Sequence, residues 1–312
     1  MTRRTRIAVS LASLVLMASG LALGQQWWQQ PGSRPGPGRR GQRPMRQRWQ
    51  PGPPTIPEDR AGVPDWKVDP HFKDDVFTFV RVQYDSGGRG WGRRGWGWET
   101  DFPDSDLNFS FRLQQLTSLK VNPQPIYLRI TDERLFDYPF LYMIEPGALE
   151  FSEDEVKTLR RYLLNGGFLM VDDFWGEYQW RNFYEQIKRV FPDREPEELK
   201  LDHEIFRCVY RLKEKPQVPS IHSWQWSGGL TWEDHGPGSN VTWEDHHFGD
   251  TRTVHYKGIF DDKARMMVII CHNTDLGDGW EREGEDPGYF HEFSEKKSYP
   301  MGINIVTYAM TH

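Results

Sequence analysis

Residues 151–175 (FSEDEVKTLRRYLLNGGFLMVDDFW) predict a helix, a tight turn and a buried strand in immediate succession. Ser152 is a natural N-cap, and Glu155 three residues later completes the pattern of a capping box. Apolar side chains then recur at helical spacing, at Val156, Leu159, Tyr162 and Leu163. Gly166 and Gly167 are expected to end the helix, because glycine enters the left-handed conformation without a steric penalty.

The strand that follows the two glycines is apolar on both of its alternating faces. Residues 168–171 read Phe-Leu-Met-Val, which is typical of a parallel strand covered by helices on both sides. The run ends at Asp172 and Asp173. Ligands of open α/β sheets bind at the carboxyl ends of the strands, so these two aspartates are the first candidates for a functional site.

Further strand and helix patterns alternate along the rest of the chain. We expect strands at residues 76–84, 126–130, 140–144, 205–212 and 265–272, and helices at 104–119, 178–190 and 301–310. This alternation predicts an α/β fold: a doubly wound, mostly parallel sheet in a three-layer sandwich.

The N-terminal part of the chain does not have the composition of a folded domain. Residues 1–24 carry three arginines before an apolar run and small residues, the pattern of a signal peptide for export, although an uncleaved membrane anchor is the alternative. Residues 25–64 are rich in Pro, Gly, Arg and Gln and predict a disordered tether. Residues 65–312 then form one α/β domain with a polar, aromatic insertion at about 220–253. The expected location is periplasmic or extracellular.

Charge is distributed unevenly between these segments. The chain carries −6 overall; residues 1–24 hold three arginines, and residues 25–60 hold seven arginines against two carboxylates, so the remainder carries −14. An acidic domain of this kind argues against nucleic acid as the main partner. The basic tether is either a solvated spacer or makes weak contact with anionic lipid or envelope polymer, so the expected partner is an envelope polymer or an envelope protein.

Several polar residues could carry chemistry near the ends of the predicted strands. Asp172 and Asp173, together with His203, are candidates for general acid–base catalysis; alternatively the aspartates cap a helix or pair with an arginine. Oxygen ligands with one or two imidazoles would suit a divalent cation or sugar hydroxyls. The residues that could form such a ligand-binding rim are Asp101, Asp106, Asn108, Trp175, His272, Asn273 and Asp275.

The insertion contains a short repeat, because TWEDH at residues 231–235 recurs at 242–246. Its histidines His235, His246 and His247 are a second candidate for metal binding. Their spacing is irregular and shows no tetrahedral pattern, so a solvated acidic loop is the alternative.

Six segments together resemble one bacterial family. They are DFPDSDLN (101–108), YPFLYM (138–143), LRRYLLNGGFLMVDD (159–173), DHEIF (202–206), HNTDLGDGW (272–280) and MGINIVTYAMT (301–311). The family is known as domain of unknown function 4159, and the resemblance covers about residues 72–312. It is placed by similarity among class I glutamine amidotransferase-like folds, which are flavodoxin-like sandwiches, and some relatives occur with membrane-anchored and von Willebrand-type envelope proteins.

The chain departs from the working amidotransferases at one position. Those enzymes place a cysteine nucleophile directly after the strand equivalent to residues 168–171, whereas this chain has Asp172-Asp173-Phe174, and its two cysteines, Cys208 and Cys271, lie elsewhere. The resemblance therefore implies a binding or scaffold module of the envelope without thiol catalysis. The alternative is a carboxylate- or metal-dependent hydrolase that acts on envelope carbohydrate or peptide, with Trp175 stacking on sugar rings.

Overall fold

The computed structural model describes residues 60, 62–72, 75–86, 97–226 and 249–312. The chain divides into two units, 1–51 and 52–312, and every element described below belongs to the second. The predicted signal peptide and nearly all of the predicted tether lie outside the described residues. Among the described residues, no helix is long and apolar enough to cross a membrane.

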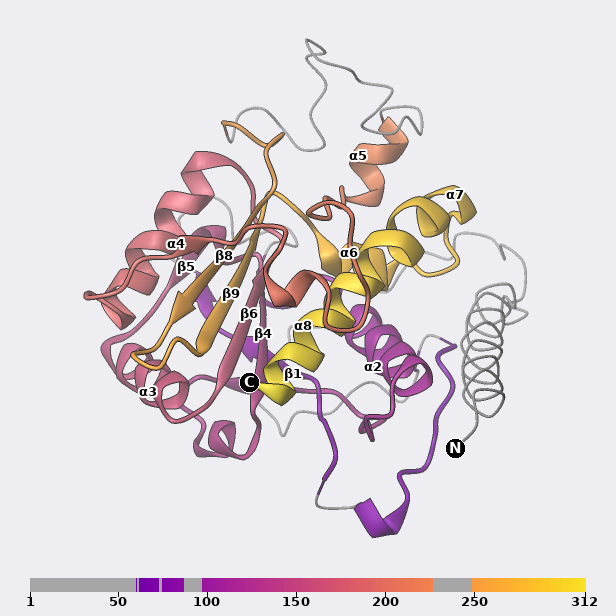
Figure 1. Cartoon of the computed structure of the whole chain (residues 1–312), viewed down its shortest axis with the longest axis horizontal. Helices are drawn as coiled ribbons and strands as arrows, with labels where there is room; N and C mark the ends of the chain where they lie inside the picture. The colour runs from indigo at the N-terminus through magenta and orange to yellow at the C-terminus, as the bar shows by residue number, and fades with distance from the viewer. Residues whose placement is uncertain (1–59, 61, 73–74, 87–96, 227–248) are drawn as a thin grey trace, which may run out of the picture. The chain divides into compact units, whose positions relative to one another are not determined.

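A seven-stranded sheet forms the centre of the domain (Figure 1), in the order β3-β1-β4-β6-β9-β8-β7. Five of its strands are parallel: β1 (Val80–Gln83), β3 (Ile126–Arg129), β4 (Phe140–Ile144), β6 (Phe168–Asp172) and β9 (Met266–His272). Numbered along the chain, these five have the order 2-1-3-4-5, which is the flavodoxin-like doubly wound order. The predicted α/β fold class is confirmed, and the strand order reverses between β1 and β4.

One edge of the sheet is antiparallel. β8 (His255–Phe260) pairs antiparallel with β9, and the two-residue β7 (Glu197–Glu198) pairs antiparallel with β8. A separate short ladder joins β2 (Asp85–Ser86) to β5 (Leu149–Glu150). The sheet is therefore mostly, rather than entirely, parallel.

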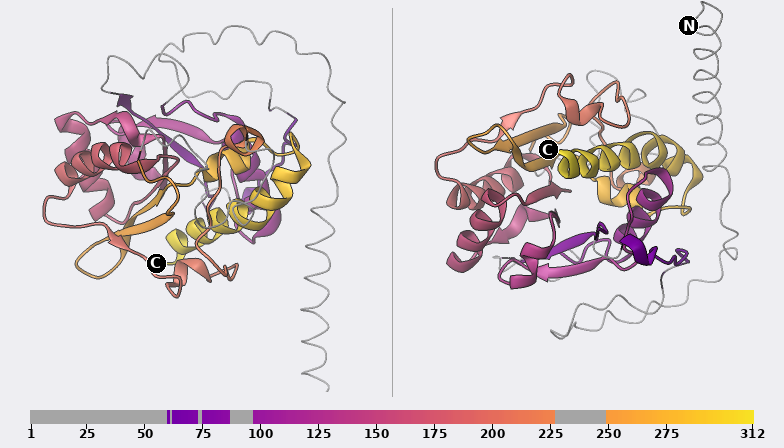
Figure 2. Two further views of the ribbon diagram at one scale, coloured as in Figure 1. Left: turned by 90° about the horizontal axis from the view of Figure 1, so that it is seen from above. Right: turned by 60° about the horizontal axis from the view of Figure 1, so that its bottom comes forward.

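Helices cover both faces of the sheet. α3 (Glu153–Leu164) and α4 (Gly176–Val190) pack on one face, where buried side chains of both helices join those of the strands in one apolar cluster. α2 (Asp104–Leu116), α6 (Leu276–Glu281) and α8 (Tyr299–Thr311) cover the other face, as Figures 1 and 2 show. Aromatic contacts hold this second layer against the sheet; for example, the ring centroids of Phe79, directly before β1, and Phe109 on α2 are 5.5 Å apart.

Short helices make up the remaining regular structure. They are η1 (Pro70–Phe72), η2 (Glu133–Asp137), η3 (Pro146–Ala148), η4 (Glu204–Phe206), α5 (Ile221–Trp226), α7 (Pro287–Tyr289) and the π-helix η7 (Phe290–Ser298), which runs directly into α8. The π-helix was not anticipated from the sequence.

The helix and strand predicted at residues 151–175 are confirmed. The Ser152 hydroxyl accepts a hydrogen bond from the Glu155 amide at 3.3 Å, and the Glu155 carboxylate accepts one from the Ser152 amide at 2.8 Å, which completes the capping box. Gly166 ends α3 with a φ of 107°. All five residues of β6 are buried, because helices cover both sides of this central strand.

The strand predicted at residues 205–212 is wrong. Residues 204–206 form η4 instead, and the following segment crosses α8 without joining the sheet. The Asn304 side chain of α8 holds it: its Oδ1 accepts from the amides of Val209 (3.1 Å) and Tyr210 (2.7 Å), and its Nδ2 donates to the Tyr210 carbonyl at 2.8 Å. A buried side-chain amide has taken the place of a neighbouring strand as hydrogen-bond partner.

Candidate metal centre

Acidic residues from three loops meet at the carboxyl ends of the parallel strands. Asp101 lies in the connection from β1 to α2, Asp173 directly follows β6, and Asp275 lies between β9 and α6. Asp278 and Glu281 are on α6 itself. Because β1, β6 and β9 are parallel, their carboxyl ends share one edge of the sheet. We call these five residues the carboxylate cluster.

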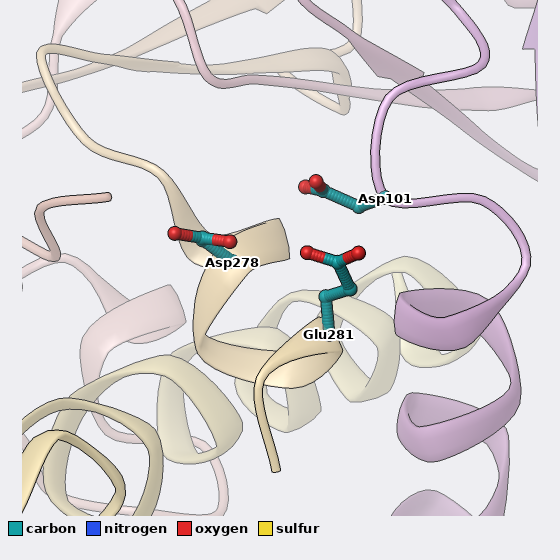
Figure 3. Close-up of side chains that lie close together, drawn as sticks. All are labelled: Asp101, Asp278 and Glu281. Carbon is teal, nitrogen blue, oxygen red and sulfur yellow. The ribbon is translucent and has the colours of Figure 1, made fainter. Parts of the chain in front are cut away.

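The carboxylate cluster consists of two overlapping triads. One carboxylate oxygen from each of Asp101, Asp278 and Glu281 lies within 4.8 Å of the other two, and Figure 3 shows the three side chains turned toward one another. Asp101 forms a second such triad with Asp173 and Asp275. Two oxygens on opposite sides of a cation are about 4–5 Å apart, since metal–oxygen bonds of Mg²⁺ and Ca²⁺ measure about 2.0–2.6 Å. The spacing of both triads therefore suits coordination of a cation.

The backbone at this edge adopts a conformation that is unusual for residues with side chains. Asp101 (φ 60°), Glu145 (φ 50°), Asp173 (φ 56°) and Asn273 (φ 60°) are all left-handed. Glu145, Asp173 and Asn273 directly follow β4, β6 and β9. Each such residue costs roughly 1 kcal/mol or more, and strained residues of this kind cluster at functional sites.

Burial and mutual repulsion oppose ionisation of the cluster. Burial, followed by repulsion from Glu281 and Asp278, raises the pKa of Asp101 well above its usual value. The pKa of Asp275 is raised in the same way, by burial and then by Asp173 and Asp278. One oxygen of Asp101, Oδ2, is buried and has no hydrogen-bond partner. A bound cation would offset the repulsion among the carboxylates, and it would give Asp101 Oδ2 an interaction partner.

Arg282 supplies a positive charge to the cluster. Its Nε lies 3.0 Å from Asp278 Oδ1 and 2.6 Å from Glu281 Oε2. Burial nevertheless raises the pKa of Glu281 to about 7, in opposition to this arginine. Five carboxylates and one guanidinium leave four negative charges when all are ionised.

Asp172 has a different role from its neighbour Asp173. Its Oδ2 accepts hydrogen bonds from the Tyr142 hydroxyl (3.1 Å) and from the Gly277 amide in the first turn of α6 (3.0 Å), whereas its Oδ1 is buried without a partner. Burial raises the pKa of Asp172 to about 7. The sequence left open whether the two aspartates contact a helix start or belong to a ligand site. Asp172 contacts the start of α6, and Asp173 belongs to the carboxylate cluster.

Gly277 allows the cluster to approach the sheet closely. A Cβ atom at this position would lie 2.8 Å from the Tyr142 hydroxyl oxygen and 3.0 Å from Asp101 Oδ2. Both distances are too short for an unstrained contact. The absence of a side chain therefore lets Asp101 and Tyr142 converge on the start of α6.

Three residues of the predicted rim have structural partners elsewhere. Asp106 pairs with Arg81 inside the domain, with 2.5 Å between Oδ2 and Nη2. Asn108 donates to the Trp280 carbonyl at 2.8 Å and so joins α2 to α6. Asn273 accepts from the Gly176 amide at 2.8 Å and donates to two carbonyls of the segment before β8.

Of the two candidates with ring side chains, Trp175 contacts the cluster, whereas His272 contacts the Gly176 carbonyl and Phe174. Trp175 is buried, and its Nε1 donates to Asp173 Oδ1 at 2.9 Å. His272 lies 3.1 Å from the Gly176 carbonyl through Nε2, and its ring centroid is 4.8 Å from that of Phe174. Burial lowers the pKa of His272 to about 4. This imidazole is therefore neutral at physiological pH and donates from Nε2.

The structure does not bring His203 to the candidate aspartates. Its Nδ1 accepts from the Ile205 amide at 3.2 Å, and its ring centroid lies 5.7 Å from that of Tyr308. Tyr308 in turn contacts Phe168 at the start of β6, whereas Asp172 stands at the end of that strand. The three insertion histidines, His235, His246 and His247, lie outside the described residues.

Two members of the cluster, Asp278 and Glu281, were missed by the sequence reasoning. Their signal was present as Asp275, Asp278 and Glu281 at intervals of three residues, a spacing that places side chains on neighbouring positions of a helix. The short helix α6 was not predicted, so the three acidic residues were not expected to lie on neighbouring positions of one helix.

One comparison identifies relatives of the chain. Residues 78–310 match the family described as Domain of unknown function (DUF4159), and no curated protein matches. The matched range includes every strand of the parallel sheet and the whole carboxylate cluster. The chain belongs to the DUF4159 family.

Proposed function

We propose that this chain is an exported module of the cell envelope that binds divalent cations in the carboxylate cluster. The observation that carries the proposal is the convergence of two carboxylate triads on Asp101, whose buried Oδ2 has no hydrogen-bond partner. Export rests on the N-terminal arginines and the apolar run that follows them. The glutamine amidotransferase-like relationship stays a prediction from the resemblance.

The donor set selects the class of metal. All five side chains offer carboxylate oxygens, which are hard ligands suited to Ca²⁺, Mg²⁺ or Mn²⁺. Four net negative charges match two divalent cations, and a carboxylate shared by two triads is typical of two-metal sites. We therefore expect two cations, with Asp101 as the shared ligand.

Calorimetric titration of the chelator-treated chain with Ca²⁺, Mg²⁺ and Mn²⁺ tests the proposal. Asp101→Asn should weaken binding roughly 100-fold or more, because it removes the ligand common to both triads. Asp154→Asn is the matched control, since this side chain is 84% exposed on α3. Equal binding by the wild type and Asp101→Asn, or no binding by the wild type at millimolar cation, would overturn the proposal.

Native mass spectrometry counts the cations. Asp173→Asn should remove one cation and Glu281→Gln the other, because each side chain belongs to only one triad. Asp101→Asn should remove both. A single cation that all three variants lose would contradict the two-metal arrangement while leaving cation binding itself intact.

A hydrolase acting on envelope carbohydrate or peptide is the second candidate. The observation that favours it is Asp172, whose pKa of about 7 suits proton transfer at neutral pH, beside carboxylates that could hold water-activating cations. Release of reducing ends or free amino groups from purified envelope glycan and peptide, with Mn²⁺ present, is the assay. Turnover that Asp172→Asn abolishes would favour the hydrolase. If the wild type shows no turnover, the binding module remains the favoured function.

A further inference from the structure

We infer that a basic cleft between residues 211–216 and the π-helix η7 binds an anionic polymer that carries repeated phosphate or carboxylate groups. The cleft has a volume of about 410 Å³, and its lining includes Arg211, Lys213, Glu214, Pro216, Lys296 and Lys297. This site is separate from the carboxylate cluster, and the inference does not depend on the proposed cation binding.

The charge of the cleft is opposite to that of the domain around it. Four of the lining side chains are cationic and one is acidic, although residues 61–312 carry −14 in total. Lys297 Nζ lies 3.3 Å from Glu214, and Lys296 Nζ lies 2.6 Å from Glu292 outside the lining. Arg211 and Lys213 take part in no ion pair among the described residues. Their charges are available to a ligand.

Both walls of the cleft are held by the interior of the domain. The Asn304 side chain fixes the backbone at Val209 and Tyr210, and the buried Tyr256 hydroxyl donates to the Pro216 carbonyl at 2.8 Å. On the other wall, Phe293 and Ser294 of η7 are buried. The cationic side chains therefore extend from a backbone whose position is fixed.

The π-helix is a second, independent sign of function. η7 extends over nine residues, Phe290–Ser298, and carries Lys296 and Lys297 in its last turn. π-helical turns are rare and occur frequently at functional sites. Here it places two successive lysines beside the cleft.

The side chains specify the chemistry of the ligand. The arginine presents a planar fork that matches phosphate or carboxylate, and the lysines act as point charges. A volume of 410 Å³ falls at the lower end of the range of small-molecule sites. The cleft thus accommodates one or two anionic units of a longer chain, and affinity for such a polymer would fall steeply with salt.

Titration of the full chain with two probes tests the inference, in EDTA to exclude bridging cations. The probes are sodium tripolyphosphate and a galacturonate pentamer, and the readout is the dissociation constant at low and at 0.5 M salt. The double variant Arg211→Glu/Lys213→Glu should weaken binding of at least one probe about tenfold or more. Both side chains are exposed, so the substitutions leave the core unchanged.

The matched control has the same change in net charge at a distant surface. Lys157→Glu on α3 and Lys263→Glu between β8 and β9 together alter two exposed lysines outside the cleft lining, and this double variant should bind like the wild type. A response to tripolyphosphate alone identifies phosphate as the group bound, and a response to the pentamer alone identifies carboxylate. Equal weakening by the two double variants, or none by the cleft variant, overturns the inference. Asp101→Asn should bind both probes normally, so failure here and failure of cation binding are distinguishable.

Discussion

Arg81 shows how a single buried side chain organises the approach to the carboxylate cluster. Its guanidinium donates to Asp106, to the Ser105 hydroxyl (2.8 Å) and to the Thr100 carbonyl (2.7 Å). Asp101 immediately follows Thr100, so this network fixes the backbone from which the carboxylate common to both triads extends. The arginine and Asp106 are both fully buried, and such a pair is costly to break because the remaining charge stays in the interior.

Asp106→Asn should therefore lower the free energy of unfolding by about 3–5 kcal/mol, since it leaves the Arg81 charge uncompensated. Urea unfolding followed by tryptophan fluorescence measures the loss. The control is Asp85→Asn, which breaks an exposed pair with Arg129 and should cost less than about 1 kcal/mol. Similar losses in the two variants would show that burial of the Arg81 pair has no special energetic weight.

A second prediction at the scale of single residues concerns Asp172, whose raised pKa should make the stability of the domain depend on pH. Its pKa of about 7 in the folded domain compares with 3.8 for an unperturbed aspartate, so between these values the native state holds a proton that the unfolded chain has released. The free energy of unfolding therefore falls as pH rises from about 4 to 7, by at most roughly 4 kcal/mol.

Asp172→Asn should lack this fall, because an amide does not titrate. Melting temperatures of the chelated proteins between pH 4 and 8.5 provide the measurement. The variant should gain stability relative to the wild type with increasing pH, up to about pH 7. Parallel curves for the two proteins would mean that Asp172 ionises normally in the folded domain.

At the scale of elements, α3 is stabilised by its N-terminal cap. Ser152→Ala should cost about 1 kcal/mol, because the Glu155 amide loses its acceptor. Ser152→Thr retains a hydroxyl and should cost a few tenths of a kcal/mol. Denaturant midpoints of the two variants provide the comparison; equal destabilisation would assign the effect to something other than the cap.

Elements with strong local signals were predictable, and elements that depend on distant partners were not. The cap at Ser152, the glycine stop at Gly166 and the apolar strand at 168–171 are local, and the structure confirms them. The segment 205–212 has strand-like composition, yet Asn304, almost a hundred residues away, takes its backbone hydrogen bonds. No local pattern specifies that contact.

The candidate site was predictable to the same extent. Asp101 and Asp275 were expected at a ligand-binding rim, and Asp173 was expected as an acid–base candidate at the end of a strand; the structure brings the three together. Asp106 was expected at the rim too, but it forms a buried ion pair with Arg81 of β1 and so lies in the interior. Sequence alone cannot divide acidic residues between ligands and counterions, since that depends on which arginine lies beside them.

At the scale of the whole molecule, the basic N-terminal segment is opposite in charge to the acidic domain. This segment predicts salt-sensitive association of the chain with anionic lipid or envelope polymer. Exposed charges are screened over about 8–10 Å at physiological ionic strength. The chain should therefore leave the membrane fraction at high salt, and deletion of residues 25–60 should release it at low salt as well. Fractionation checks this. Retention at high salt without the basic segment would mean that residues 1–24 act as an anchor.

The left-handed residues at the strand ends have a consequence for how the family varies. If only the backbone mattered at Asp101, Asp173 and Asn273, glycine would meet the requirement with less strain. The hydrogen bonds of Asn273 to neighbouring loops favour asparagine at that position, whereas the proposed cation site would favour aspartate at positions 101 and 173. If the cluster binds cations as proposed, lineages that lose this binding should change to glycine at positions 101 and 173 and keep asparagine at 273. A family-wide alignment in which glycine replaces all three residues together would show instead that the backbone conformation is selected at these positions and the side chains are not.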